Sequence, residues 1–61
     1  MEKFEQLKQV IASIEPDFEK FYAKGVKAAS PRIRKAMQEI KTLAQEIRAE
    51  VQEERNRLDA E

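Results

Sequence analysis

The spacing of the apolar side chains constrains the fold most, because it runs as one pattern through two separate halves of the chain. In each half these residues step alternately by three and four positions, which is the spacing of a helix that buries one face. The face is about three positions in seven wide, which suits a helix that touches two neighbours in a bundle. We expect these residues to form the core of an oligomer: Phe4, Leu7, Ile11, Ile14, Phe18 and Phe21 in the first half, and Ile33, Met37, Ile40, Leu43, Ile47 and Val51 in the second.

A short joint separates the two halves and contains the only Gly of the chain. Gly25 suits the left-handed position just past a helix end. Ser30 followed by Pro31 predicts a new helix, with Ser30 as its N-cap and Pro31 at its first position. We therefore expect one domain over residues 1–61, with helices at about 2–24 and 31–58 and a joint at 25–30. The middle of the joint is read either as a tight turn or as a short helical turn.

Pro16 falls inside the first predicted helix, where it removes one backbone hydrogen bond and crowds the preceding turn. The apolar spacing from Ile14 to Phe18 nevertheless stays in phase across it. This favours one helix with a kink near Pro16. A break into two short helices is the alternative.

The fold class that follows is all-α, an antiparallel hairpin of two helices, because so short a joint folds the second helix back along the first. A chain of 61 residues buries little core by itself. With no Cys and no His it lacks disulfides and the usual ligands of a structural zinc site. We therefore expect two hairpins to assemble into a four-helix homodimer, or into a higher homo-oligomer.

Several classes of function find no support. No stretch approaches the roughly 20 apolar residues that span a membrane, so we expect no membrane contact. The hydroxyls of Ser13, Ser30 and Thr42 have no suitable base close in sequence, which argues against an enzyme with a small-molecule substrate. The acids over residues 46–54 read as a solvated helix face, so no metal site and no cofactor are expected.

The joint is also where positive charge gathers. The stretch "KGVKAASPRIRK" over residues 24–35 contains five cations and no acid, although the whole chain has net charge zero. Backbone N–H groups at the start of the second helix are expected to point into the same patch, which is the geometry of an anion site. The candidate phosphate-binding residues are Lys24, Lys27, Arg32, Arg34 and Lys35. Arg48, Arg55 and Arg57, with acids around them in sequence, are expected to matter little.

The sequence resembles the core of the bacterial, chlamydial-type linker-histone-like nucleoid proteins, in a short form without their Lys/Ala-rich tail. The likeness covers nearly the whole chain and includes "LAQEIR" at residues 43–48. Its most distinctive part is KGxKAAxxRxRK, at Lys24, Gly25, Lys27, Ala28, Ala29, Arg32, Arg34 and Lys35. The resemblance implies a helical chromosomal protein of the bacterial cytoplasm that binds DNA without sequence preference, with the joint facing the phosphates.

The leading hypothesis is thus a nucleoid-associated, histone-like protein whose DNA binding is weak, non-specific and sensitive to salt. Two alternatives stay open. One is a structural module for oligomerisation or protein interaction, in which the charged joint only keeps the chain soluble. The other is a four-helix dimer that binds RNA, whose A-form backbone would suit the same cations.

Overall fold

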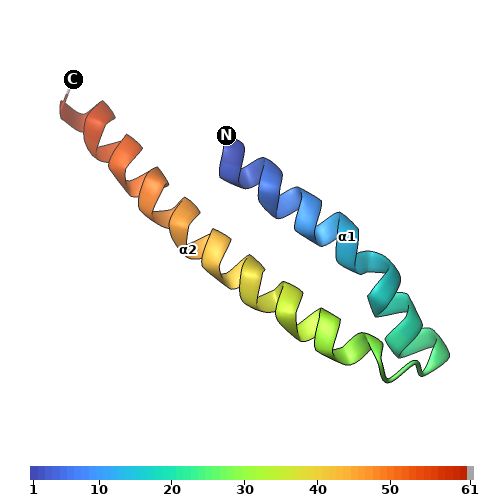
Figure 1. Cartoon of the computed structure of the whole chain (residues 1–61). Coiled ribbons are helices and arrows are strands. Elements are labelled where there is room, and N and C mark those ends of the chain that lie inside the picture. Colours follow the sequence, from blue (N-terminus) through green and yellow to red (C-terminus); the bar gives the residue numbers. More distant parts are fainter. Residues whose placement is uncertain (61) are drawn as a thin grey trace.

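The computed structural model describes residues 1–60 and folds them into two α-helices joined by a short turn (Figure 1). Helix α1 spans Glu2–Lys24 and helix α2 spans Ala29–Ala60. The two helices lie side by side and antiparallel, and the orange-to-red end of α2 extends beyond the N-terminus of α1 (Figure 1). The molecule is a rod of 53 × 15 × 14 Å. The prediction of an all-α helical hairpin is confirmed.

The end of α1 forms as its sequence predicts. Gly25 follows the last helical residue in the left-handed region, at φ 67° and ψ 25°. In this conformation the N–H groups of Gly25 and Val26 both donate to the carbonyl oxygen of Lys20, the latter over 2.9 Å. The turn therefore satisfies a carbonyl that the helix end would otherwise leave unpaired.

The start of α2 differs from its prediction. The helix begins at Ala29, two residues before the predicted start, so Ser30 is its second residue rather than its N-cap and Pro31 its third. The cause is a tight turn at residues 26–28. The N–H groups of Ala29 and Ser30 donate to the carbonyl oxygens three positions earlier, those of Val26 and Lys27. This turn already supplies the first backbone bonds, and Pro31 needs none so near a helix start.

Helix α1 continues through Pro16 without interruption, so the prediction of one helix is confirmed over the alternative of two. Its axis bends in the cyan part of the ribbon, just past its middle (Figure 1). Pro16 is exposed, and the carbonyl of Ala12 loses the N–H that a different residue at position 16 would offer. The bend therefore has an identifiable cause.

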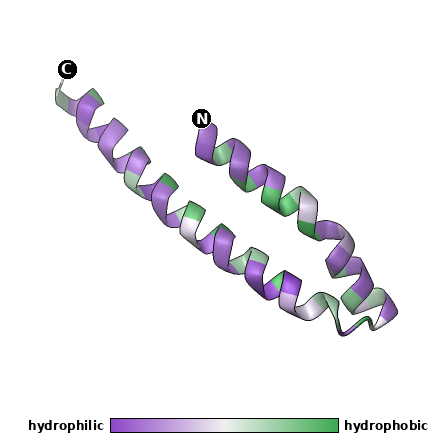
Figure 2. Cartoon of the chain, in the orientation of Figure 1, coloured by the Kyte–Doolittle hydropathy of each residue, from purple (hydrophilic) through white to green (hydrophobic). Residues whose placement is uncertain are grey.

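The core lies between the helices and is small: within residues 1–60 only Ile14, Ala29 and Ala36 are buried. Figure 2 shows hydrophobic and hydrophilic residues alternating in bands along both helices. Of the predicted core residues, the structure leaves a further group half-buried between the helices: Leu7, Phe18, Phe21, Ile33, Ile40, Leu43 and Ile47. Four others are exposed, namely Phe4, Ile11, Met37 and Val51.

Within a single hairpin, the contact with α1 therefore covers only part of the core that the sequence predicts for α2. Ala36 and Leu43 face α1, whereas Met37 and Val51 point outwards with exposed fractions of 39% and 58%. A helix with a single neighbour buries a narrow stripe of two positions in seven. The remaining apolar positions form a separate row beside that stripe.

Ion pairs join the two helices at both ends of the paired region. Near the open end, the Lys3 ammonium lies 2.7 Å from a carboxylate oxygen of Glu46 and 3.8 Å from one of Glu50. The hydrogen bond to Glu46 raises the pKa of Lys3 above its ordinary value. Near the turn, Asp17 pairs with Arg32. Each pair matches one position of α1 with one of α2, so together they favour the observed register.

Candidate nucleic-acid interface

The five predicted phosphate-binding cations gather at the closed end of the hairpin, which we call the basic tip. They come from the last residue of α1, from the turn and from the first two turns of α2. All of their residues are exposed: Lys24, Lys27, Arg32, Arg34 and Lys35. Gly25 makes the gathering possible, because its left-handed conformation turns the chain sharply enough for both helix ends to lie at one point.

Arg32 differs from the other cations of the basic tip because it has a partner on α1. Its Nε and Nη2 groups donate to the same oxygen of Asp17, over 2.9 and 2.8 Å. The guanidinium lowers the pKa of the Asp17 carboxyl below its usual range, chiefly through this hydrogen bond. Asp17 stands 15 positions earlier in the chain, so counting charges within residues 24–35 missed it. Arg32 thus links α2 to α1 through its ion pair with Asp17, and it also adds to the positive charge of the basic tip.

The other four cations of the basic tip have no carboxylate partner. Lys24, Lys27, Arg34 and Lys35 make no ion pair with any residue in 1–60, although most cations elsewhere on the hairpin do. Their charge is therefore not neutralised by the chain itself. An exposed surface of this kind attracts polyanions over a distance set by the salt concentration.

The start of α2 offers fewer free backbone donors than the sequence suggested. The N–H groups of its first two residues, Ala29 and Ser30, are used within the turn. Its third residue is Pro31, which has no N–H. Side chains are therefore expected to supply most phosphate contacts at the basic tip.

Tyr22 lies one turn before the basic tip and is 75% exposed. Its ring stacks on Phe18 at 6.0 Å between centroids and meets the edge of Phe21 at 5.0 Å. The two neighbouring rings thus contact Tyr22 while most of its surface stays in solvent.

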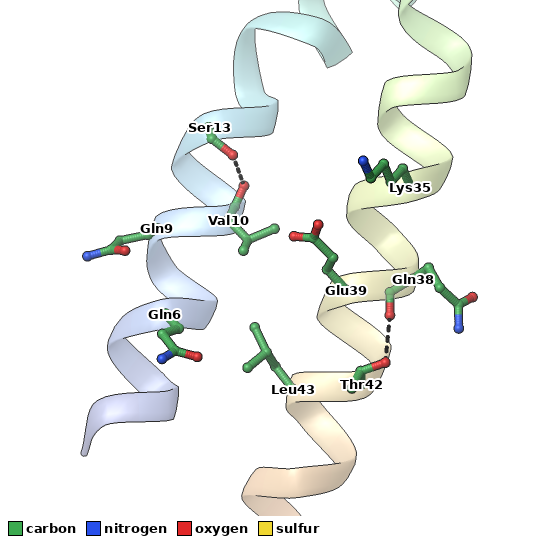
Figure 3. A pocket seen from close by; sticks show the side chains of 9 residues that line it. All are labelled: Gln6, Gln9, Val10, Ser13, Lys35, Gln38, Glu39, Thr42 and Leu43. Atoms are coloured by element: carbon green, nitrogen blue, oxygen red, sulfur yellow. Dashed lines mark hydrogen bonds between the residues drawn. The ribbon is translucent and has the colours of Figure 1, made fainter.

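A shallow groove between the helices, on one side of the hairpin, is lined mainly by polar side chains (Figure 3). Lys35 and Glu39 point toward the space between the helices, whereas Gln9 and Gln38 point away (Figure 3). The hydroxyls of Ser13 and Thr42 donate to carbonyl oxygens of their own helices, over 2.8 and 3.2 Å. The groove therefore presents no hydroxyl aligned with a base.

Residues 1–60 contain no group of three or more carboxylates placed to hold a metal ion. Neither helix combines the length and the apolar character needed to cross a bilayer. Glu46 and Glu50, read from the sequence as a solvated face, are half-buried and pair with Lys3.

Comparison with known proteins adds one finding. The family model described as "Histone H1-like protein Hc1" matches residues 1–57 of the chain. No curated protein and no solved structure gives a significant match. The matched residues include all of α1, the turn, the basic tip and most of α2.

Proposed function

The chain belongs to the histone H1-like protein Hc1 family, and we propose on that premise that it is a non-enzymatic DNA-binding protein of the bacterial nucleoid, in the cytoplasm. The basic tip is the observation that supports DNA phosphates as the partner and the tip cations as the residues that contact them. Four exposed cations there lack any carboxylate partner within residues 1–60. DNA phosphates are the partner that such a surface suits best in a histone-like protein.

Binding through the basic tip is proposed to be weak and indifferent to base sequence. Lysine and arginine side chains at an exposed turn contact phosphates, which carry no sequence information. Reading bases would need an element shaped to enter a groove with fixed donors and acceptors. If all five tip cations each neutralise one phosphate, the tip alone gives a log–log salt slope of about −4.5 per hairpin. Affinity would then fall roughly 500-fold between 50 and 200 mM salt.

The test replaces the three tip lysines, Lys24, Lys27 and Lys35, with Gln and leaves Arg32 in place to keep its pair with Asp17. We expect the salt slope to lose about 2.7 in magnitude, with an unchanged helical signal in circular dichroism. Binding would be measured by fluorescence anisotropy on duplex DNA of two unrelated sequences. An unchanged affinity and slope would place the DNA contact outside the tip lysines.

Parallel titrations with single-stranded DNA and duplex RNA separate the RNA-binding alternative, which predicts tighter binding to the A-form duplex. If the unaltered chain bound no nucleic acid at 50 mM salt, the proposal would fail. The basic tip would then serve only solubility, and the hairpin would act as an interaction module.

We further propose that a second copy of the chain covers the exposed apolar row of each hairpin, giving a four-helix homodimer. Residues seven apart share one side of a helix, and in an antiparallel pair the corresponding rows of the two helices lie on the same side. This apolar face consists of the exposed Phe4, Ile11, Met37, Val51 and Leu58, with the half-buried Phe18 and Ala44 between them.

The surface area of the hairpin supports this assembly. The chain exposes 5053 Å², whereas a compact monomer of 7.1 kDa would expose about 4,100 Å². The excess is close to the roughly 800 Å² that each partner buries in a stable complex of standard size. A second hairpin of the same length and periodicity has the shape to cover it.

A further inference from the structure

Helix α2 has four exposed cations spaced seven residues apart, which we call the basic row: Arg34, Lys41, Arg48 and Arg55. Residues at this spacing lie on one side of a helix, offset by only about 20° per step. At 1.5 Å per residue the row is roughly 31 Å long. It begins at the basic tip, because Arg34 belongs to both, and runs along α2 away from the turn.

The basic row contains no acid, and almost none of its neighbours on the helix surface is an acid. Side chains three and four positions away are the neighbours of a helical residue. For Arg48 these are Ala44, Gln45, Val51 and Gln52. The same holds along the row, where apolar residues flank one side and Gln38, Gln45 and Gln52 the other. The acids close to Arg48 in sequence are therefore not its neighbours on the helix surface, whereas Arg55 has one acidic neighbour, Asp59.

Ion pairing distinguishes most of the basic row from Arg32 and Arg57 of α2, which are paired with acids. Arg34, Lys41 and Arg48 make no ion pair within residues 1–60. Arg55 only approaches Asp59, at 3.9 Å, and both side chains are about three-quarters exposed, so solvent screens the contact. Arg57, by contrast, lies beside Glu54 and is hydrogen-bonded to it.

Most acids of α2 lie away from the basic row, and Asp59 beside Arg55 is the exception. Glu39, Glu46 and Glu53 form their own series at seven-residue spacing, and Glu46 pairs with Lys3 of α1. On a helical projection this series falls on the opposite edge of the face that contacts α1. The acids of this series therefore do not neutralise the basic row.

We propose that the basic row extends the phosphate-binding surface from the tip along α2, so that a DNA duplex contacts the side of the hairpin as well as its end. This inference rests on the proposed DNA binding and adds a second contact surface to it. Duplex DNA carries one charge per about 1.7 Å of its axis, so a row of roughly 31 Å runs beside a length of duplex that holds roughly 18 phosphates in both strands, some of them on the side that faces the row. Each cation of the row therefore has a phosphate within reach in many relative positions, as binding without sequence preference requires.

The basic row predicts a steeper salt dependence than the basic tip alone. Lys41, Arg48 and Arg55 add three cations to the five of the tip, which brings the expected slope from about −4.5 to about −7 per hairpin. The test replaces these three with Gln and measures anisotropy on a 30-base-pair duplex between 50 and 200 mM salt. We expect the slope to return to about −4.5. The side chains are exposed, so the circular dichroism spectrum should not change.

Arg57→Gln is the matched control, since it removes a cation from the same helix that is already paired with an acid. It should leave the slope unchanged. A row variant that binds like the unaltered chain, while the variant of the three tip lysines binds more weakly, overturns the row and leaves the proposed function standing. If the unaltered chain does not bind DNA at all, both fail.

A second copy of the chain is the competing partner for the basic row, because the row borders the apolar face. Sedimentation equilibrium of the row variant separates the two partners. An unchanged oligomeric mass together with the smaller salt slope supports DNA as the partner. A loss of oligomeric mass means that the row serves contact between copies, and it overturns the proposal whatever the DNA titration shows.

Discussion

Arg32 of the basic tip has two possible roles: it pairs with Asp17 and so stabilises the hairpin, and it is also a candidate contact for a phosphate. It is exposed, like the other tip cations, yet both of its donor groups lie on one oxygen of Asp17. A phosphate must compete with that carboxylate for the guanidinium. The tip therefore offers four uncommitted cations and one whose release would loosen the link between α1 and α2.

Asp17→Asn should both weaken the hairpin and strengthen DNA binding. Arg32 lowers the pKa of Asp17, so the pair contributes to the free energy of unfolding above the ordinary carboxyl pKa of about 3.9. That contribution is lost as the pH falls through the lower pKa of the folded state. The melting temperature of the unaltered chain should therefore exceed that of the variant at pH 7, and the difference should vanish at strongly acidic pH.

The same variant leaves Arg32 without its carboxylate, so DNA affinity at a given salt concentration should rise, because the guanidinium no longer has to leave Asp17 to contact a phosphate. Glu19→Gln is the control, since Glu19 is an exposed acid of α1 without an ion pair in residues 1–60. It should change the melting temperature little at any pH. A difference between the chain and Asp17→Asn that stayed constant with pH would show that the pair contributes nothing through its charge.

At the scale of the helices, Pro16 destabilises the helix in which it lies, because a proline inside a helix removes a backbone hydrogen bond. Replacing it with Ala restores a backbone hydrogen bond to the carbonyl of Ala12 and raises helix propensity. We expect the free energy of unfolding to increase by about 1–3 kcal/mol, measured by urea denaturation. Pro31→Ala is the matched control: the third residue of a helix needs no N–H partner, so little change is expected. A less stable Pro16→Ala chain would mean that the bend itself fits a neighbour, such as a second copy.

The bounds of the helices were predictable where a single residue type decides the backbone conformation, and not where the geometry of a turn decides it. Gly25 marks the end of α1 because few other residues tolerate its positive φ. The start of α2 was missed because the bonds from Ala29 and Ser30 to the turn depend on backbone geometry that has no sequence signature.

The candidate site was likewise predictable only in part. A run of cations identifies the basic tip, but the pair between Asp17 and Arg32 joins residues that only the fold brings together. The basic row of α2 could have been predicted from the sequence, by comparing residues seven positions apart instead of residues next to one another. It was harder to predict which apolar residues lie between the two helices. Three positions in every seven are apolar, and the sequence does not say which two of them face the other helix of the hairpin.

At the scale of the whole molecule, the apolar face predicts association. Replacing Ile11 and Val51, which are 44% and 58% exposed, with Gln should weaken the dimer at least about tenfold while leaving each hairpin folded. Sedimentation equilibrium would measure this, with twice 7.1 kDa expected for the unaltered chain. Ala12→Gln with Ala49→Gln is the control, since both residues are exposed but lie outside the apolar face. A stable helical monomer of the unaltered chain at micromolar concentration would contradict the assembly.

The extension of α2 past the start of α1 has a consequence for how the rod comes apart. Residues 51–60 are all exposed, and a helix of ten residues would hardly persist in water by itself. In a single hairpin their helical state is propagated from the paired region, so their amide hydrogens should exchange with solvent well before those facing α1. Opening then begins at the end farthest from the turn, and the turn with its cations is the last part to lose its shape.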